Sequence, residues 1–498
     1  MNTVNYLGLL RLLAPETVLT ITGLIVLFFD AGVMRRQSIP RRQQVAAFLL
    51  SAGAMLAIGW SRHYSLADPN STSMLVIDPL TQLMKQVILF LTIFTALVSL
   101  ESKFTPHVGE YFALLALATL GMMFLVSSVD LLMLFVSLEL TSLSLYILTA
   151  FQKDKLESSE AALKYFLLGG VSAAFLLFGM SWVYGLTGET NLIRIAGQLR
   201  DRATDPVLLA AMVMMLIGLG FKIAAAPFHL WAPDVYQGAP TPSAALIASG
   251  SKVAGFFVLA RMTLAGLAGA EGSGVWNGFA PGWVPVLAVL AVLSMTLGNL
   301  AAIAQTRVKR LLAYSAIAHA GYMLPALMAH NTMGTIALLY YVTTYALTMV
   351  GAFGVVAVVE QQTGSDAYDA FTGLSRRSPA LAVCLLVFLL SLAGLPPFAG
   401  FFAKFYVFTA AASASTRSLG LLWLVILALA MSVVSLYYYL QLLKQAFAVD
   451  PPAGAKIIRP LPSTLFTLVF LALLVLLLGA LPHLLVNKLQ AALVVSGL

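Results

Sequence analysis

Two stretches of this sequence decide its fold: GLGFKIAAAPFHLWAPDVYQGAPTP at residues 218–242 and LAGLPPFAGFFAKFYVF at residues 392–408. Each is an apolar run that proline interrupts close to a lysine. Proline removes a backbone donor and clashes with the preceding helical turn, so Pro227 and the pair Pro396 and Pro397 should each break a helix. At membrane depth, an irregular backbone persists only where it is buried in protein or lines a cavity. Broken helices in corresponding places in two halves are typical of internally repeated transporters.

The two breaks are separated by about five predicted spans, from the seventh to the twelfth. This spacing predicts two five-helix units, and an odd number of helices in each unit would invert the second relative to the first. We therefore expect three transmembrane helices in residues 1–107, a first five-helix repeat in 108–270, a second in 271–447, and one C-terminal transmembrane helix in 448–498.

The composition places the whole chain in a membrane. Its 498 residues are 60% hydrophobic and only 10% charged, with a mean hydropathy of +0.93. A helix needs about 20 apolar residues to cross the hydrocarbon core, and such runs recur along the chain. We expect an all-α polytopic membrane protein with about fourteen transmembrane helices. Their predicted centres are Leu24, Ala52, Leu89, Leu117, Leu138, Leu176, Leu216, Gly255, Leu290, Ala318, Leu347, the break near Pro396, Ala428 and Leu473.

Lysine and arginine are divided unevenly between the predicted loops. Of the 28 such residues, 15 fall in one alternating set of loops and 8 in the other, with five lysines left inside spans. Positively charged loops stay on the side from which helices insert, so the larger set should be cytoplasmic and both termini should face the opposite side. This topology explains the net charge of +8 better than nucleic-acid binding, which needs a concentrated basic face.

Several classes of site are excluded by residue type. Cys384 is the only cysteine, so the chain can form no internal disulfide and cannot supply the thiolates of an iron–sulfur cluster. The sequence contains no HExxH pair, no GxxxxGK[ST] loop and no GxGxxG motif. We therefore expect no cofactor and no metal in this chain. The energy for transport must then come from an ion gradient or from a partner.

Six ionisable residues nevertheless lie inside predicted spans. A charge at the bilayer centre costs about 2.5 to 3.5 kcal/mol even on insertion scales, and nothing structural requires that cost. Intramembrane charges usually face a bundle interior or a water-filled path, so they indicate a route for ions or protons. These residues are Glu139, Lys85, Lys164, Lys222, Lys252 and Lys404.

Six segments are distinctive: SLELTSLSLYIL around Glu139, EAALKYFLLGGVSAAFLLFG around Lys164, GFKIAAAPFHLWAPDVYQGAPTP at Lys222, SGSKVAGFF around Lys252, KRLLAYSAIAHAGY ending at Tyr322, and GLPPFAGFFAKFYVF around Lys404. Through these segments, from about Asp130 to Phe408, the chain resembles the N-type antiporter-like membrane subunit of bacterial proton-pumping NADH-quinone oxidoreductase, respiratory complex I. The resemblance includes the absence of the long C-terminal lateral helix found in L-type subunits.

The resemblance implies roles for the residues at matching positions. Glu139 and Lys222 match the family's buried acid and base pair, Lys252 matches the connecting lysine, and Lys404 matches the terminal one. Lys164 matches a further lysine near the first half-channel. We expect Lys222 to release its proton toward Lys252 when the Glu139 interaction weakens, and Lys404 to pass it to the opposite side. Quinone reduction elsewhere in the complex would drive these steps.

Static roles remain open for several of these residues. Glu139 and Lys222 would fix helix packing if they formed a permanent ion pair, and Lys164 would do so in a surface ion pair. His229 and His319 are weaker candidates for proton relays, because a histidine bonded between helices is an equally good account.

Two further positions favour the static interpretation. We assign Lys85, which follows Asp78 by seven residues, a structural role outside the main pathway. The aromatic run from Tyr437 to Tyr439 is interpreted as packing rather than as a belt at the membrane interface.

The resemblance also implies a setting. The chain would be a non-redox subunit of a translocase, with NADH, FMN, iron–sulfur clusters and quinone in partner subunits. Its partners would be the other membrane subunits of complex I, including neighbouring antiporter-like subunits, together with membrane lipid and protons. It would lie in the bacterial plasma (inner) membrane as a multi-pass protein, with both termini on the periplasmic side.

The alternative function is a subunit of a multi-subunit cation/proton antiporter driven by ion gradients. Hard cations such as sodium prefer oxygen ligands, whereas the buried charges here are mostly lysines, which suit protons better. A third class, an assembly subunit without transport activity, would leave those lysines unexplained.

Overall fold

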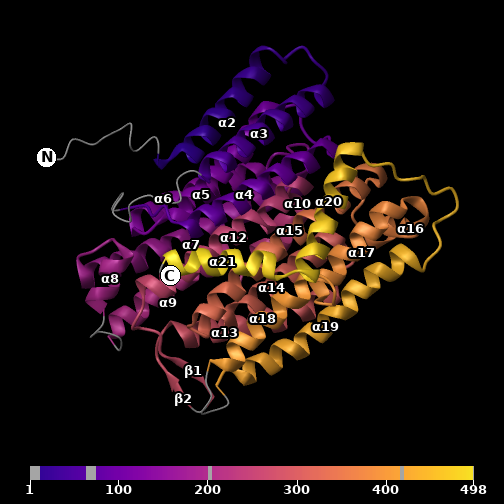
Figure 1. Ribbon diagram of the computed structural model, residues 1–498. Coiled ribbons are helices and arrows are strands. Elements are labelled where there is room, and N and C mark those ends of the chain that lie inside the picture. The colour runs from indigo at the N-terminus through magenta and orange to yellow at the C-terminus, as the bar shows by residue number, and fades with distance from the viewer. Residues whose placement is uncertain (1–11, 63–73, 200–204, 277, 415–419, 497–498) are drawn as a thin grey trace.

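The computed structural model describes residues 12–62, 74–199, 205–276, 278–414 and 420–496. Nearly all of them form one helical bundle (Figure 1). Its helices are α2 (Ala14–Gly32), α3 (Ile39–Ser61), α4 (Pro79–Val98), η1 (Ser99–Glu101), α5 (Val108–Ser127), α6 (Leu131–Thr149), α7 (Leu156–Thr187), α8 (Leu192–Leu199), α9 (Pro206–Lys222), α10 (Trp231–Gly238), α11 (Thr241–Ala248), α12 (Gly250–Arg261), η2 (Met262–Gly266), α13 (Trp283–Ile303), α14 (Val308–Met328), α15 (Thr332–Thr363), η3 (Tyr368–Phe371), α16 (Leu374–Arg377), α17 (Pro379–Ala393), α18 (Ala399–Ser413), α19 (Leu422–Phe447), α20 (Pro462–Ala480) and α21 (His483–Ser496).

The predicted fold class is confirmed. Within the described residues, twelve helices are long and apolar enough to cross a membrane, and α9 and α17 are shorter apolar helices that end at the two breaks. Every predicted centre lies inside a helix except the one near Pro396, which lies in the break between α17 and α18. The total of fourteen spans stays a prediction, because the two broken spans are not single full-length helices.

The first predicted break follows Lys222, where α9 ends. The chain turns through residues 223–230 and continues as α10. Two side-chain contacts hold this irregular segment: the Trp231 indole donates to the Phe221 carbonyl at 3.0 Å, and the Ala226 N–H donates to the Ser294 hydroxyl at 2.8 Å. Exposed backbone groups are thus satisfied inside the protein, as membrane burial requires.

The second break separates α17 from α18 and has a similar construction. Gly394 adopts a left-handed conformation with φ of 85°, which glycine reaches at little steric cost. The Gly400 N–H then donates to the Ser391 hydroxyl at 3.2 Å. The two breaks therefore place Lys222 directly before one irregular segment and Lys404 one turn inside the helix that follows the other.

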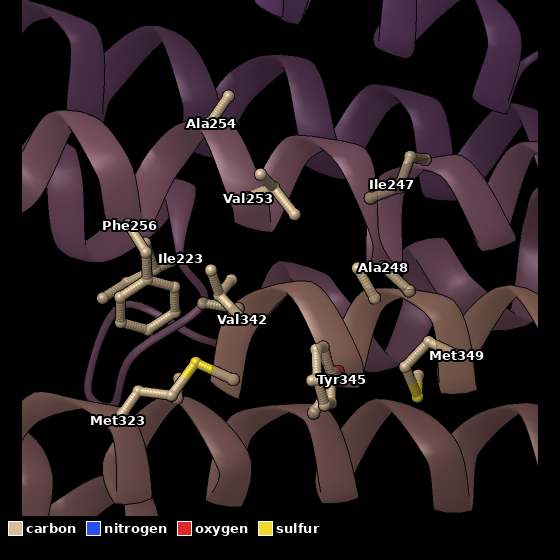
Figure 2. Close-up of a cluster of buried hydrophobic side chains, with 14 of the residues drawn as sticks. Ile223, Ile247, Ala248, Val253, Ala254, Phe256, Met323, Val342, Tyr345 and Met349 are labelled. Carbon is tan, nitrogen blue, oxygen red and sulfur yellow. The ribbon is translucent and has the colours of Figure 1, made fainter. Parts of the chain in front are cut away.

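Helix α15 forms the centre of the bundle (Figure 1). The most apolar stretch of α15 is entirely buried, as is that of the span built from α11, α12 and η2, whereas α7 and α19 bury only a third of theirs. Figure 2 shows side chains from these central helices in one apolar cluster, with Val342, Tyr345 and Met349 of α15 near Ala248 and Val253. Polar groups in this region are consequently shielded from lipid by other helices.

Three features of the structure were not predicted. The short helix α8 lies between α7 and α9 along the chain, and strands β1 (Ser273–Val275) and β2 (Gly278–Ala280) pair antiparallel. The C-terminal region contains α21 in addition to the expected span α20. Helix α21 packs on α4, where the Leu80 N–H donates to the Ser496 hydroxyl at 3.3 Å.

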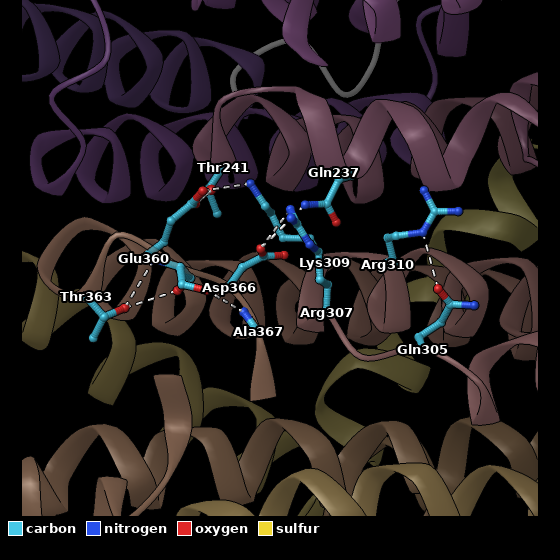
Figure 3. A network of polar contacts seen from close by, with 11 residues as sticks. Gln237, Thr241, Gln305, Arg307, Lys309, Arg310, Glu360, Thr363, Asp366 and Ala367 are labelled. Atoms are coloured by element: carbon cyan, nitrogen blue, oxygen red, sulfur yellow. Dashed lines mark hydrogen bonds and ion pairs between the residues drawn. The ribbon is translucent and has the colours of Figure 1, made fainter. Parts of the chain in front are cut away.

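The loops with most of the positive charge lie at one end of the bundle. The Lys103 N–H donates to Gln361 at 3.2 Å, Gln362 donates to the Arg459 carbonyl at 2.6 Å, and Arg307 lies 3.6 Å from Asp366. Figure 3 shows part of this region, with Arg307 and Asp366 among its polar residues. The grouping agrees with the division of loops made from the sequence.

Candidate functional site

Lys222 and Glu139 lie near each other but do not form an ion pair. Lys222 is only 3% exposed, and its ammonium donates to the Ser142 hydroxyl at 3.1 Å. Ser142 is on α6, and Glu139 lies almost one turn before it on that helix. The charge of Glu139 interacts with that of Lys222. Among the described residues, none forms a hydrogen bond to Glu139 Oε1, which is buried. The predicted acid and base are therefore neighbours with Ser142 holding the base.

The close approach of α12 explains how Lys222 is enclosed. A Cβ at Gly255 would lie 3.5 Å from Lys222 Cγ and 3.1 Å from Ile223 Cγ2. The small residue thus lets the second lysine-bearing helix lie against the end of α9. Lys252 is on this same helix, less than one turn before Gly255.

Lys252 is almost fully buried, with 1% exposure. Its ammonium donates to the main-chain carbonyl of Ala316 in α14. It also lies over the Tyr345 ring, 5.4 Å from the ring centroid, where the negative face of an aromatic ring attracts a cation. Lys252 is thereby oriented toward α14 and α15 and away from lipid.

His319 lies beyond Lys252, in the centre of a group of tyrosines. Its Nδ1 is 2.9 Å from the Tyr341 hydroxyl and its Nε2 is 3.3 Å from the Tyr439 hydroxyl. The His319 ring is 5.1 Å from that of Tyr345 and 5.7 Å from that of Tyr322. Both ring nitrogens therefore have a hydroxyl partner through which a proton can be exchanged.

Lys404 has an environment that resembles that of Lys252. It is 5% exposed, and its ammonium donates to the Ala393 carbonyl at 2.9 Å and to the Ser432 hydroxyl at 2.7 Å. It lies over the Tyr322 ring, 5.0 Å from the centroid. A lysine that extended to a membrane interface would not make these contacts.

These contacts produce a continuous row across the middle of the bundle. The Tyr345 ring contacts both Lys252 and His319, and the Tyr322 ring contacts both His319 and Lys404. The row is therefore lysine, tyrosine, histidine, tyrosine, lysine. Of the two predicted histidine candidates, the structure brings His319 into the row.

Lys164 occupies a different place. Its ammonium lies 2.7 Å from Glu160 and 2.8 Å from Asp234, and its side chain is 43% exposed. Asp234 also pairs with Arg310 at 2.8 Å. These four residues line a cavity of about 250 Å³ at the charged end of the bundle. Lys164 thus belongs to an ion-pair cluster at the surface and does not contact Lys222.

His229 lies in the irregular segment between α9 and α10, partly exposed beside Pro227. Its Nδ1 is buried and has no hydrogen-bond partner among the described residues. The structure does not bring His229 into contact with any of the buried lysines.

The sequence analysis missed Glu16 and assigned Tyr439 to packing alone. Lys85 pairs with Glu16 of α2 at 2.6 Å in a fully buried setting, and Glu16 was not among the candidates. Tyr439 bonds to Ser315 as well as to His319, although the run that contains it had been interpreted as packing. An acidic residue just inside an otherwise apolar N-terminal span was the available signal for Glu16.

The described residues contain no group of three or more histidine, cysteine, aspartate or glutamate side chains arranged to hold a metal ion.

A family model described as NADH:quinone oxidoreductase/Mrp antiporter, TM, matches residues 128–433. The chain belongs to this family. All of the candidate residues from Glu139 to Lys404 lie within the matched region.

Individual relatives identify the type of subunit. NADH-quinone oxidoreductase subunit N 2 of Acidobacterium capsulatum is 51% identical over 502 aligned positions, covering 98% of this chain and 100% of the relative. The F(420)H(2) dehydrogenase subunit N of Methanosarcina mazei is 37% identical over 485 positions, covering 92% and 94%. The resemblance to N-type subunits is thus confirmed within this family.

Solved structures agree with that assignment. A chain of respiratory complex I from Thermus thermophilus with bound Aureothin is 34% identical, with a TM-score of 0.78 and coverage of 96% of this chain and 100% of that one. A chain of the Mrp complex from Dietzia sp. is 21% identical with a TM-score of 0.79, which shows a shared fold alone. The chain is therefore a multi-span membrane protein of the complex I type.

Proposed function

We propose that this chain translocates protons as the N-type membrane subunit of an NADH-quinone oxidoreductase. The observation that carries this proposal is the buried row of proton-exchanging side chains from Lys252 through His319 to Lys404, with Lys222 and Glu139 at its near end. Buried charges of this kind mark ion and proton pathways in membrane proteins. A row with a purely structural role would be replaceable by apolar packing.

The arrangement at Glu139 suggests how transfer begins. Lys222 bonds to Ser142 rather than to Glu139, so the ammonium has a neutral acceptor while a carboxylate is nearby. When the Lys222 ammonium moves closer to Glu139, the carboxylate stabilises the charged form of the lysine. When the two groups move apart, Lys222 releases its proton more easily. Reduction of quinone elsewhere in the complex supplies the free energy that changes this separation.

The same proposal includes the two five-helix repeats, residues 108–270 and 271–447. Corresponding helices have similar lengths: α7 and α15, the third span of each unit, both contain 32 residues. Both also end at a glycine in the left-handed conformation, Gly188 and Gly364. The final span of each unit, residues 241–266 and α19, contains 26 residues. These equivalences support a common ancestry of the two units.

The chain itself carries no redox centre in this proposal. NADH, FMN, iron–sulfur clusters and quinone belong to partner subunits, and a single cysteine supports that division. The partners are other membrane subunits, including antiporter-like neighbours, within the bacterial inner membrane. Both termini face the periplasm, because the loops grouped around Lys103, Arg307 and Arg459 carry the excess of positive charge.

The test uses the complex purified through a tag on this chain and reconstituted into vesicles. Lys252→Ala should reduce proton pumping by tenfold or more while the complex still assembles, and Lys444→Ala, at an exposed lysine near the end of α19, serves as the matched control. Normal pumping in an assembled Lys252→Ala complex would contradict the proposal. Purification without redox subunits, together with gradient-driven cation exchange, would instead support the antiporter alternative.

A further inference from the structure

Asn299 is an amide side chain buried inside the mostly apolar span formed by α13. Its exposed fraction is 0%. A buried amide without hydrogen-bond partners is costly, so such groups are normally paired. The proposed proton pathway draws its residues from other helices and gives Asn299 no part. The contacts of this amide therefore need an explanation of their own.

The Asn299 amide bonds to two tyrosines as well as to its own helix. Its Nδ2 donates to the Met295 carbonyl at 2.7 Å and to the Tyr322 hydroxyl at 2.8 Å. The Tyr438 hydroxyl donates to its Oδ1 at 3.0 Å. Because a carbonyl oxygen can only accept, the bond to Met295 fixes which end of the amide is the nitrogen. The Tyr322 hydroxyl is thus held as an acceptor.

Two glycines bring α13 close enough to α14 for this short side chain to reach Tyr322. A Cβ at Gly298 would lie 2.6 Å from the Ala318 nitrogen, and a Cβ at Gly321 would lie 2.8 Å from the Met295 nitrogen. Both are main-chain atoms, which cannot move aside without moving a helix. The packing of the two helices therefore fixes the position of the amide, and the amide fixes the position of the Tyr322 hydroxyl.

Both tyrosines are neighbours of the pathway residues. The Tyr322 ring lies 5.0 Å from the Lys404 ammonium and 5.7 Å from the His319 ring, to which it is nearly perpendicular. The Tyr438 ring lies 4.5 Å from that of Tyr439, whose hydroxyl contacts His319. A ring face that meets an ammonium stabilises its charged form. Anchoring the Tyr322 hydroxyl keeps that face against Lys404.

We propose that Asn299 is a positioning residue that fixes the Tyr322 ring between His319 and Lys404 and thereby sets how readily Lys404 takes up and releases its proton. With the hydroxyl anchored, the ring favours the charged form of the lysine. Without the anchor, the ring turns away and Lys404 holds its proton less strongly. The inference rests on the proposed proton-translocating function and adds to it a residue that acts through Tyr322.

The competing role for such a residue is helix packing, since an asparagine can bond across helices simply to hold them together. A packing role predicts a lower unfolding temperature in variants of Asn299. It also predicts a normal ratio of protons pumped to NADH oxidised in every complex that assembles. The pumping ratio therefore separates positioning from packing.

The test uses the whole complex, purified through a tag on this chain and reconstituted into vesicles. Asn299→Leu should lower the pumping ratio about threefold to tenfold, as expected for the loss of a buried hydrogen bond. Tyr322→Phe should cause a similar loss, and the double variant should lose no more than either single one, because both changes break the same bond. Thr296→Val is the matched control on α13, since its hydroxyl donates to the Val292 and Leu293 carbonyls of its own helix; its ratio should be normal.

A structural readout accompanies the pumping ratio. In a cryo-EM map of the Asn299→Leu complex, the Tyr322 ring should be displaced from its position over Lys404. The inference is overturned if the ring stays in place, if either single variant pumps normally once assembled, or if the losses of Asn299→Leu and Tyr322→Phe multiply in the double variant. It is equally overturned if Thr296→Val lowers the ratio as much as Asn299→Leu.

The design also covers misfolding and failure of the proposed function. If Asn299→Leu does not assemble, the Tyr322→Phe complex decides by itself, because that change removes a single oxygen atom and keeps the ring. Failure of the proposed function would appear as normal pumping in Lys252→Ala. Normal pumping in Asn299→Leu together with lost pumping in Lys252→Ala would overturn this inference alone.

Discussion

The ammonium of Lys85 lies 2.6 Å from Glu16 Oε1, and neither side chain is more than 2% exposed. The pair joins α2 to α4. A buried ion pair is not in itself strongly stabilising, but removing one partner leaves an uncompensated charge at a typical cost of 3 to 5 kcal/mol. The structural role expected for Lys85 thus has a defined partner.

Lys85→Ala should lower the thermal stability of the complex because it leaves Glu16 buried without a counter-charge. The double variant Lys85→Met with Glu16→Leu should recover most of that loss, since apolar residues of similar volume replace both charges. Thermal unfolding of the purified complex measures both. A double variant as unstable as Lys85→Ala would contradict this explanation, because the loss of stability would then not come from an unpaired Glu16 charge.

Ser142→Ala should reduce proton pumping about tenfold or more because Lys222 loses its hydroxyl partner; a hydrogen bond to a charged group contributes about 1.5 to 3 kcal/mol. The control is Ser144→Ala, on the same helix, whose hydroxyl donates only to the Leu140 carbonyl. Pumping by reconstituted vesicles is the measurement. Equal effects from the two serines would show that Ser142 acts through helix packing alone.

Lys404→Arg should leave the complex assembled but abolish pumping through this chain. Arginine retains the positive charge and the donors, yet it does not give up its proton in proteins. Lys444→Arg, at an exposed position on α19, is the control. The ratio of protons pumped to NADH oxidised checks the result, and a normal ratio in Lys404→Arg would mean that the terminal lysine does not carry the proton.

Gly479→Ala should destabilise the complex by about 1 to 3 kcal/mol, as overpacking does. A Cβ at Gly479 would lie 2.1 Å from the Pro397 carbonyl oxygen and 2.6 Å from the Ala399 nitrogen, both main-chain atoms of the second break. Gly170→Ala on α7 meets no atom within 4 Å and should be neutral or stabilising. Thermal unfolding of the two variants should differ by several degrees, and equal values would contradict the close packing of α20 on the break.

The sequence was sufficient to predict the broken helices and the buried row of lysines. Proline has a local effect on its own helix, and a lysine in an apolar span is costly wherever the helix packs. Neither inference requires knowledge of which helices are neighbours. The sequence alone therefore indicates Lys222, Lys252 and Lys404, without their contacts.

Partners between helices could not be predicted in the same way. Glu16 and Lys85 are 69 positions apart, and nothing in either span indicates that these two side chains meet. The environment of Lys164 was ambiguous for the same reason, because Asp234 reaches it only through the fold of α10. Pairing of side chains across a bundle depends on packing, which no single span encodes.

The role of Tyr439 could not be predicted either, because it depends on the direction in which the side chain points. Three consecutive tyrosines necessarily point in different directions on a helix, and the structure buries Tyr438 and Tyr439 while Tyr437 remains 54% exposed. The buried members contact polar groups of other helices, Asn299 and Ser315 among them, whereas the Tyr437 hydroxyl accepts from Gln441 of its own helix. Residue type alone could not separate a membrane-facing tyrosine from one that orients His319.

The acceptors of the three pathway lysines differ in whether a mutation can remove them. Lys252 and Lys404 both donate to main-chain carbonyls, those of Ala316 and Ala393, which every amino acid supplies. Lys222 depends on a serine side chain instead. A single substitution at Ser142 can therefore remove the acceptor of Lys222. The main-chain acceptors of Lys252 and Lys404 persist through substitution at residues 316 and 393. Natural variants with altered proton coupling should accumulate at the start of the row.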